Sequence, residues 1–498
     1  MNNRGWARWA PWAGVLALAG QAVWAAEPPL RACRLEGVSV EAQCGHVRRP
    51  LDPASPQGVA IDIHFAVVPA LARNKKPDPL VMFAGGPGQS AIALAGPMSR
   101  LFARVLNRRD LVLIDQRGTG RSAPLACDTD NPGRPLRDAD MAAQHRELQA
   151  CLRRLQQLPH GDLRHYTTAV AMADAEAVRE LLGAPVVNLV GGSYGTRAAL
   201  EYLRQYPQRV RRVILDGVAP PDMVLPATFS ADAQSSLDAL LDACDQDPAC
   251  QGAHGPARAR WQRLLASLPR TVTVQHPLSG QPETFTMTHE RLSSLVRLPL
   301  YAPALAAGLP HALAEAEQGR FGPLVGLATS LGGRNPKALQ LAMGMHLSVV
   351  CSEDMPRLQM SSEKAGADFG DVAKQFYSQA CQAWPRGSVP EAFYGVPVSP
   401  VPVLVLSGGA DPVTPPRHGQ RVAGALGSRA RHIVVQQAGH GVMALPCMRD
   451  VLFRFLDAAT EAEAMAVDAA CASGIPRPLA FRPVQPAASA SAGTEGSR

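Results

Sequence analysis

Short apolar runs alternate with amphipathic stretches along most of the chain. Apolar or alternating runs predict strands at residues 59–68, 80–83, 110–115, 186–190, 210–216, 402–411 and 432–435. Helical periodicity predicts helices at residues 97–106, 141–155, 167–182, 198–203 and 448–456. Because most of these strands alternate with helices, the pattern predicts an α/β protein with a mostly parallel sheet covered on both faces.

The alternation breaks between residues 219 and 398. This region holds helical pieces rich in Ala and Leu, several prolines, and one alternating run at residues 271–275. We interpret it as an inserted, largely helical cap that divides the core domain into residues 27–218 and 399–475. The last stretch, residues 476–498, is rich in Pro, Ala, Ser and Gly and is expected to form a flexible tail.

The first 26 residues have the pattern of a secretory signal peptide. Arg4 and Arg8 precede a mostly apolar run at residues 10–24, and Val23-Trp24-Ala25 has the small-x-small spacing of a cleavage site. A membrane anchor is the alternative, but the run is short for a span and no later run reaches about 18 apolar residues. We therefore expect an exported protein, periplasmic or secreted, with no stable membrane insertion after signal cleavage.

Composition and charge narrow the class of protein. The 498 residues are 46% hydrophobic, which is enough for a large core. The net charge of +7 becomes +5 without Arg4 and Arg8. No dense basic run with interleaved aromatic residues is present, so the sequence gives little support to nucleic-acid binding.

Ten cysteines follow the predicted signal peptide, and an even number in an exported chain indicates disulfides. Sequence alone does not determine which cysteines pair, but neighbours along the chain are attractive partners. These pairs are Cys33 with Cys44, Cys127 with Cys151, Cys244 with Cys250, Cys351 with Cys381, and Cys447 with Cys471. None of them has the spacing of a zinc site, and we expect neither a metal nor an organic cofactor.

The segment Gly191-Gly192-Ser193-Tyr194-Gly195 joins a predicted strand to a predicted helix. A serine on so tight a turn has strained backbone angles, so residues two positions away must lack side chains, as Gly191 and Gly195 do. The alternative is an ordinary glycine-rich connection. The strand before it and the helix after it favour a nucleophilic Ser193 in an α/β-hydrolase fold.

A serine nucleophile needs a base, an orienting acid and an oxyanion hole. In this fold the chain order is Ser, then Asp or Glu, then His, which favours Asp411 and His440 on loops after late strands. Asp216 also ends a strand and is the rival acid. The backbone N–H of Tyr194 is the first expected oxyanion donor, and the loop containing Gly85 and Gly86 is expected to supply the second.

These motifs together resemble those of prolyl aminopeptidases and exported tripeptidyl aminopeptidases, which are α/β-hydrolase serine peptidases. The matching motifs are Gly85-Gly86-Pro87-Gly88, Asp115-Gln116-Arg117-Gly118-Thr119-Gly120-Arg121-Ser122, Gly191 to Gly195, Asp411-Pro412-Val413-Thr414-Pro415, and Gly439-His440-Gly441 followed by Cys447. The last two resemble the C-terminal region of tripeptidyl aminopeptidases. Prolyl aminopeptidases usually have His before the first motif, whereas this chain has Ala84, which weakens an assignment of proline specificity. The resemblance also implies a structural role for residues 115–122, with an Asp115–Arg117 ion pair bracing the oxyanion loop.

An aminopeptidase must recognise the ammonium group of its substrate, for which a partly desolvated carboxylate in the cap is the physical partner. The resemblance implies such a carboxylate without identifying it. Glu353 and Asp354, beside Cys351, are the best local candidates. A solvated pair of surface acids is the equally acceptable alternative.

The sequence thus predicts an exported serine exopeptidase that cleaves peptide bonds near free N-termini through an acyl-enzyme on Ser193. A carboxylic-ester hydrolase of the same fold, acting on a small molecule, is the alternative, because both share the triad and the oxyanion hole. A binding protein on an inactive hydrolase fold is disfavoured because every catalytic position is occupied. Dehalogenase or epoxide-hydrolase chemistry requires Asp at the position of Ser193.

Overall fold

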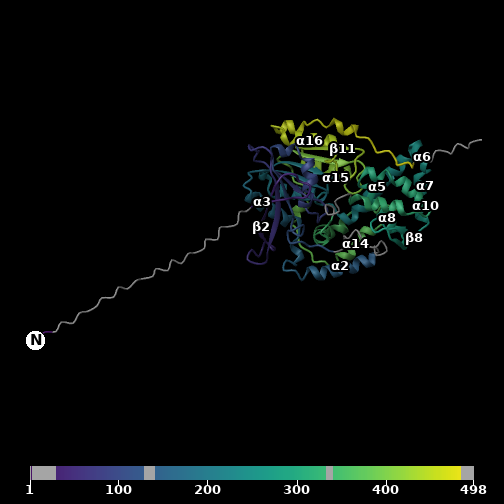
Figure 1. Cartoon of the computed structure of the whole chain (residues 1–498), viewed down its shortest axis with the longest axis horizontal. Coiled ribbons are helices and arrows are strands. Elements are labelled where there is room, and N and C mark those ends of the chain that lie inside the picture. Colours follow the sequence, from purple (N-terminus) through teal and green to yellow (C-terminus); the bar gives the residue numbers. More distant parts are fainter. Residues whose placement is uncertain (1, 3–29, 128–140, 333–339, 484–498) are drawn as a thin grey trace, which may run out of the picture.

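A twisted sheet forms the centre of the molecule in the computed structural model, which describes residues 2, 30–127, 141–332 and 340–483. Within these residues the main sheet has nine strands in the order β1-β2-β3-β5-β4-β6-β7-β10-β11. The strands are β1 Leu30–Cys33, β2 Ala42–Pro50, β3 Ala60–Val68, β4 Leu80–Phe83, β5 Leu111–Ile114, β6 Val187–Gly192, β7 Val210–Asp216, β10 Val403–Gly408 and β11 Ala430–Val435. The pairings from β1 to β5 are antiparallel, and all those from β5 to β11 are parallel. The predicted mostly parallel sheet is confirmed (Figure 1).

The strands predicted from apolar runs are present, and β4 and β7 have the predicted bounds. Strands β1 and β2 were missed because both lie at the antiparallel edge, neither contains a continuous apolar run, and nearly all of their residues are partly or fully exposed. Pairing with β3, and not an apolar run, holds β2 in the sheet.

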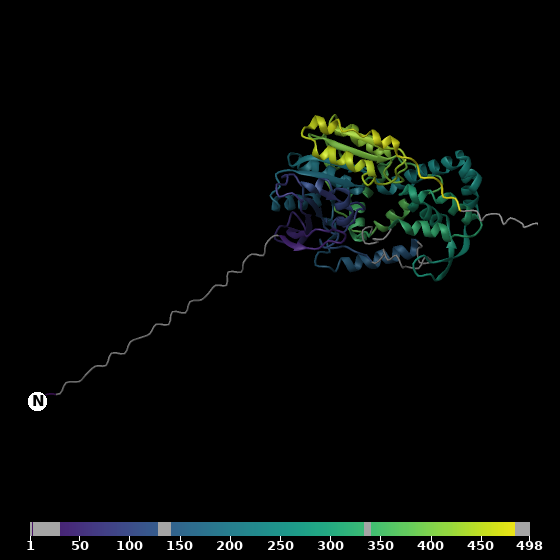
Figure 2. The same ribbon diagram turned by 45° about the horizontal axis from the view of Figure 1, so that its top comes forward.

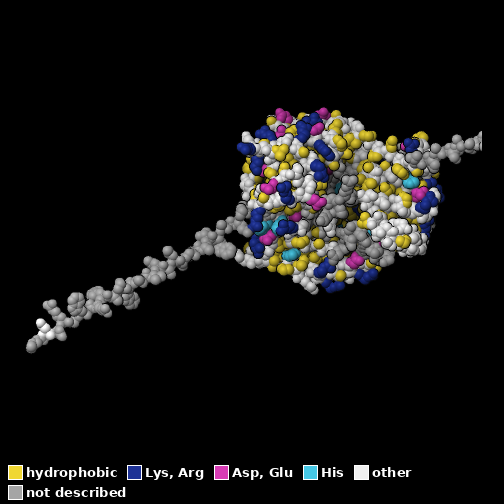
Figure 3. Space-filling view, in the orientation of Figure 1, with side chains coloured by type: hydrophobic (Ala, Val, Ile, Leu, Met, Phe, Trp, Pro, Cys, Tyr) yellow, Lys and Arg dark blue, Asp and Glu magenta, His cyan; other side chains and the backbone are white. Residues whose placement is uncertain are grey.

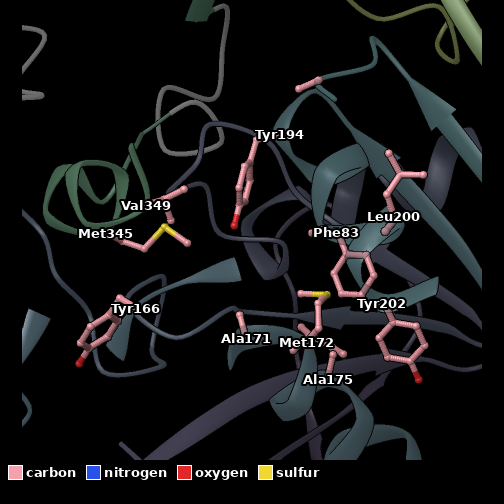
Figure 4. Close-up of a cluster of buried hydrophobic side chains, with 14 of the residues drawn as sticks. Phe83, Tyr166, Ala171, Met172, Ala175, Tyr194, Leu200, Tyr202, Met345 and Val349 are labelled. Atoms are coloured by element: carbon pink, nitrogen blue, oxygen red, sulfur yellow. The ribbon is translucent and has the colours of Figure 1, made fainter. Parts of the chain in front are cut away.

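Alternate residues of the strands face two separate hydrophobic clusters. Val81 and Phe83 of β4 belong to the cluster on one face, whereas Leu80 and Met82 belong to the cluster on the other. The helices outside the cap are α1 Ala95–Leu101, α2 Met141–Leu155, α3 Thr168–Leu181, α4 Tyr194–Gln205, α15 Pro416–Leu426, α16 Pro446–Asp457 and α17 Glu461–Met465. Residues of α3 and α4 pack on the first face, where Figure 4 shows Met172, Ala175 and Tyr202 around Phe83, and residues of α1 and α16 pack on the second. The layered α/β arrangement follows from this two-sided burial.

The region between β7 and β10 is largely helical and lies beside the sheet (Figure 2). Its elements are α5 Leu225–Gln246, α6 Pro248–His254, α7 Ala257–Ala266, the paired strands β8 Arg270–Gln275 and β9 Pro282–Met287, α8 His289–Leu300, α9 Pro303–Ala306, α10 Leu309–Glu317, α11 Gly322–Thr329, α13 Met343–Val349, a π-helical turn Val350–Asp354, and α14 Val372–Ala380. Helices α5 to α11 share a hydrophobic cluster of their own. Helices α13 and α14 instead contribute Met345, Val349 and Tyr377 to a cluster of the core. The later part of the insertion is therefore packed into the core domain.

The five disulfides predicted between sequential cysteines are confirmed. They are Cys33–Cys44, Cys127–Cys151, Cys244–Cys250, Cys351–Cys381 and Cys447–Cys471. Each closes a loop within one part of the chain, over 6 to 30 residues. None of them ties helices α5 to α11 covalently to the core.

The two ends of the chain are described only in part. Apart from Asn2, the predicted signal peptide, residues 1–26, lies outside the described residues, as do residues 484–498 of the predicted tail. The beginning of that tail is held against both the cap and the core. The Phe481 N–H donates to the Ala307 carbonyl of the cap at 2.8 Å, and Arg477 Nε donates to Gln437 Oε1 of the core at 3.0 Å. Across the described residues, no helix is both long and apolar enough to cross a bilayer. On the face in Figure 3, basic and acidic side chains are interspersed.

Candidate active site

Ser193 lies on the sharp turn between β6 and α4 with φ of 55° and ψ of −127°. Both flanking glycines are sterically required. A Cβ on Gly191 would lie 2.3 Å from the Gly195 carbonyl oxygen, and a Cβ on Gly195 would lie 2.1 Å from that of Phe83. The Ser193 N–H donates to the Asp216 carbonyl at the end of β7 at 2.9 Å. The structure therefore has the strained turn that presents a nucleophile at the carboxyl edge of a parallel sheet.

Asp411 and His440 form a hydrogen-bonded pair on the loops that follow β10 and β11. Their Oδ2 and Nδ1 atoms are 2.8 Å apart, and the Asp411 side chain is fully buried. Burial lowers the pKa of His440, but the charge and hydrogen bond of Asp411 outweigh it and raise that pKa above its usual value. Burial raises the pKa of Asp411, and the imidazole and backbone donors outweigh it in the opposite direction. The pair therefore holds a negative carboxylate against Nδ1–H.

The Asp411 carboxylate is fixed by its own loop. Oδ1 accepts the backbone N–H groups of Val413 at 2.8 Å and Thr414 at 2.9 Å, and Oδ2 accepts the Thr414 hydroxyl at 2.8 Å. The same hydroxyl oxygen is 3.1 Å from His440 Nδ1. Sequence reasoning missed Thr414 as a site residue. An Asp followed three residues later by Thr is a pattern of local side-chain turns that points to it.

The rival acid, Asp216, has a different partner. Its carboxylate accepts the backbone N–H groups of Val442 and Met443, each at 2.9 Å. Full burial raises its pKa to about 6, against the effect of these donors. Asp216 therefore holds the backbone of the segment just after His440. Among the hydrogen bonds of the described residues, none joins its carboxylate to the His440 imidazole.

The imidazole of His440 is positioned by the insertion as well as by the core. Its backbone N–H donates to the Tyr301 carbonyl at 2.9 Å, and the Tyr301 ring meets the imidazole edge-on at 5.3 Å between centroids. A Cβ on Gly217, just after β7, would lie 3.1 Å from His440 Cε1. Tyr301 follows α8 and was not identified from the sequence, because a contact over so many residues leaves no local pattern.

The predicted oxyanion loop follows β4 and borders the nucleophile. A Cβ on Gly85 would lie 3.2 Å from Ser193 Cβ, and Gly86 has φ of +110°, a conformation that favours glycine. The Gly85 N–H donates to Gln89 Oε1 at 3.3 Å. The Tyr194 backbone begins α4 directly after Ser193, where helix N–H groups lack internal partners. Both predicted sources of oxyanion donors thus lie beside Ser193.

The predicted ion pair between Asp115 and Arg117 is wrong, although Asp115 does brace the oxyanion loop. Asp115 Oδ1 accepts the Ser90 hydroxyl at 2.6 Å and the Ile92 N–H at 3.1 Å. Arg117 points the other way and binds Asp174 of α3 through two hydrogen bonds of 2.7 and 2.9 Å. Asp115 directly follows β5, whereas Arg117 lies in the turn after it, so the alternation of a strand no longer relates the two side chains.

The prediction that Glu353 and Asp354 are available to a substrate ammonium group is also wrong. Their side chains are 0% and 2% exposed, and they lie 3.3 and 3.0 Å from the two terminal nitrogens of Arg197 in α4. Glu353 also accepts the Thr168 N–H at 2.7 Å and the Thr168 hydroxyl at 3.0 Å. Burial raises the pKa of Glu353 to about 7, opposed by Arg197. A buried carboxylate of this kind requires a partner inside the protein, and Arg197 is that partner.

Within the described part of the chain, no group of three or more His, Cys, Asp or Glu side chains is arranged to hold a metal ion.

The family model that matches this chain agrees with the fold. Residues 78–444 match the family described as the alpha/beta hydrolase fold. The serine protease Hip1 of Mycobacterium tuberculosis is 27% identical over 415 residues, covering 77% of this chain and 79% of that protein. A tripeptidyl aminopeptidase of Streptomyces coelicolor is 31% identical over 196 residues, covering 36% and 35%. Carboxylesterase B of Mycobacterium tuberculosis is 26% identical over 415 residues, covering 78% of each chain. Among solved structures, a proline iminopeptidase from Mycobacterium smegmatis is 15% identical, with a TM-score of 0.40, and covers 85% of this chain and 100% of that one.

The strand order, the strained Ser193 turn and the Asp411–His440 pair together define a serine hydrolase. The match over residues 78–444 spans most of the sequence. The chain belongs to the α/β-hydrolase family, and its relatives include serine peptidases.

Proposed function

We propose that this chain is an exported serine exopeptidase that hydrolyses peptide bonds near free N-termini. The observation that carries the proposal is the Asp411–His440 hydrogen bond of 2.8 Å at the sheet edge that also bears the strained Ser193 turn. Further support comes from relatives described as a serine protease and a tripeptidyl aminopeptidase.

The proposed reaction has two halves. His440 takes the proton of the Ser193 hydroxyl as the serine oxygen attacks the scissile carbonyl, and Asp411 stabilises the resulting imidazolium. The backbone N–H groups of Tyr194 and of the Gly85–Gly86 segment stabilise the oxyanion. The imidazolium then gives its proton to the leaving amine, which leaves an acyl-enzyme on Ser193. Water attacks this ester with His440 as base again, releasing the acid and restoring the serine.

Ester hydrolysis by the same residues is the second candidate. The specific observation in its favour is that Glu353 and Asp354, the cap acids expected to bind ammonium, are buried against Arg197. The similarity to carboxylesterase B over 78% of the chain adds to it.

A substrate panel separates the two candidates. Aminoacyl and tripeptidyl p-nitroanilides, each free and N-acetylated, are compared with short-chain p-nitrophenyl esters. The exopeptidase proposal expects the free-amine amides to have the highest kcat/KM and acetylation to lower it strongly. Activity confined to esters would replace it with the second candidate.

Labelling identifies the nucleophile independently of the substrate. A fluorophosphonate should add its mass to the peptide containing Ser193 and to no other, and Ser193→Ala should abolish both labelling and turnover. Undiminished hydrolysis by Ser193→Ala would refute either form of the proposal.

Export is proposed from the N-terminal pattern and from the five disulfides, which persist in oxidising compartments. Expression of the full chain in a bacterium with a periplasm, followed by N-terminal sequencing, should find Ala26 or Glu27 as the first residue. A cytoplasmic product beginning at Met1 would contradict export.

A further inference from the structure

The oxyanion loop is supported from two sides. On the core side Asp115 holds Ser90 and Ile92, at the end of the loop. On the other side the insertion returns to the core and pairs with the loop itself. The Ala342 N–H donates to the Gly88 carbonyl at 2.9 Å, and Gln89 and Leu341 form an isolated antiparallel bridge. The insertion is thus part of the structure that holds the loop.

The loop needs such external support because of its own sequence. Gly86 and Gly88 have φ of +110° and +107°, and neither carries a side chain that restricts the backbone. Pro87, between them, has no N–H with which to anchor the chain, so its carbonyl is the group available for a hydrogen bond. An oxyanion hole works only if its donors are held in place before the reaction, since reorganisation during the step consumes its advantage.

His346, in α13, makes that bond. Its side chain is buried, with Nδ1 3.0 Å from the Pro87 carbonyl oxygen and Nε2 2.8 Å from the Tyr377 hydroxyl of α14. A carbonyl only accepts, so Nδ1 carries the proton and Nε2 accepts from the Tyr377 O–H. Burial lowers the pKa of His346 to about 4, so the imidazole is neutral at pH 7. Tyr377 therefore selects the tautomer that donates to Pro87.

We propose that His346 is a positioning residue for the oxyanion hole, holding the Pro87 carbonyl through Nδ1–H while the Tyr377 hydroxyl keeps the imidazole in that tautomer. This inference rests on the proposed function of the Gly85–Gly86 segment. It goes beyond the triad and the oxyanion donors, because His346 belongs to the insertion and its imidazole hydrogen-bonds to Pro87 and Tyr377.

Two substitutions at His346 separate its two hydrogen bonds. In His346→Asn the amide lies near the position of Nδ1 and can donate to Pro87, whereas in His346→Gln it reaches toward Tyr377 and leaves the Pro87 carbonyl without its donor. We expect kcat to fall about 10- to 100-fold in His346→Gln, less than the roughly 100- to 1,000-fold loss when an oxyanion donor is deleted. His346→Asn should recover most of this loss, and KM should stay within about twofold in both, since the interaction acts in the transition state.

Tyr377→Phe and His254→Gln complete the set. Tyr377→Phe keeps the ring but removes the hydroxyl that selects the tautomer, and should lower kcat by roughly 3- to 10-fold. It also tests the inference if the Gln variant does not fold. His254 is the matched control: it is a buried histidine whose Nε2 is 2.7 Å from the Phe481 carbonyl oxygen, remote in the cap. His254→Gln should leave kcat unchanged even where it lowers the melting temperature.

A second measurement reports on the oxyanion hole directly. A peptide aldehyde forms a tetrahedral adduct with a serine nucleophile and places an oxygen in the hole, whereas the amine product released in the first half of the reaction has no oxygen at the scissile carbon. His346→Gln should weaken aldehyde binding by the same factor as kcat/KM and leave product binding unchanged.

Three results would overturn the inference: equal kcat in His346→Gln and the parent enzyme, a loss seen only in KM, or the same loss in His254→Gln. These outcomes are distinct from failure of the proposed function, which Ser193→Ala tests in the parent chain.

Discussion

Asparagine in place of Asp411 is the sharpest test of the acid–base pair, because the structure dictates which way the amide must turn. One carboxylate oxygen accepts two backbone N–H groups, of Val413 and Thr414, at 2.8 and 2.9 Å. If the amide nitrogen faced them, the two backbone N–H groups and the amide NH₂ itself would all lack an acceptor. The Asn oxygen therefore stays at that position. Its NH₂ then faces His440 Nδ1, which must become an acceptor. The imidazole proton moves to Nε2, the nitrogen that would have to take the serine proton.

The expected loss of kcat in Asp411→Asn follows because His440 can no longer act as the base, whereas the rest of the site is kept. A triad histidine held in the wrong tautomer costs about 10⁴-fold in kcat, which corresponds to about 5.4 kcal/mol of transition-state stabilisation at 1.36 kcal/mol per decade. The oxyanion hole and substrate binding remain, so KM should change little. The fold should tolerate the change, since the Asn oxygen keeps both backbone hydrogen bonds.

The assay is kcat and KM for the best substrate of the panel, with the rate of fluorophosphonate labelling as an independent readout of nucleophilicity. Asp216→Asn is the matched control: among the described residues its carboxylate accepts only the backbone N–H groups of Val442 and Met443, and an amide oxygen in the place of Oδ2 can accept from both. We expect it to stay within about tenfold of the parent enzyme. A loss below tenfold in Asp411→Asn, or an equal loss in Asp216→Asn, would refute the assignment of the acid.

Three further outcomes follow from the charges in and around the site. Because the pKa of His440 is raised above 6.5 and the base must be neutral, kcat/KM should rise with pH along an acidic limb centred above pH 6.5, and a limb centred below pH 6 would contradict this. Burial raises the pKa of Glu353 to about 7, so the stability that its protonated form contributes is fully present below about pH 4.5 and is lost as pH rises through 7. The melting temperature of Glu353→Gln should therefore fall below that of the parent enzyme by less at pH 8 than at pH 5. Arg117→Met leaves the buried Asp174 short of its main partner and should lower the unfolding free energy in urea by about 3–5 kcal/mol, against less than about 1 kcal/mol for Arg49→Met, whose half-buried side chain contacts the same carboxylate at 3.2 Å.

The features that could be predicted from the sequence are those that depend on local motifs or on the order of elements along the chain. The Ser193 turn could be predicted because its glycines lie two positions to either side. Asp411 and His440 could be predicted because each follows a late strand and the two occur in the order that this fold requires. The disulfide partners were also near neighbours along the chain.

The errors and omissions concern contacts between distant segments. Arg197 forms an ion pair with Glu353, which is 156 residues away along the chain, and Arg117 forms one with Asp174, 57 residues away. A single sequence contains no record of which buried charges face each other, since any carboxylate near any guanidinium fits the same composition. Strand β2 was missed for a related reason, because its place in the sheet depends on pairing with β3 and not on its own polar residues.

The nearest-neighbour pairing of the ten cysteines affects how the chain can be oxidised. Taken in order from the N-terminus, the ten cysteines bond in consecutive pairs, the first to the second, the third to the fourth and so on, over at most 30 residues. A chain that enters an oxidising compartment N-terminus first would expose each pair together before the following pair arrives. An oxidant acting in that order would form all five native bonds without any rearrangement. If the chain is exported in this way, its maturation would require a donor of disulfides but no rearrangement of mispaired cysteines.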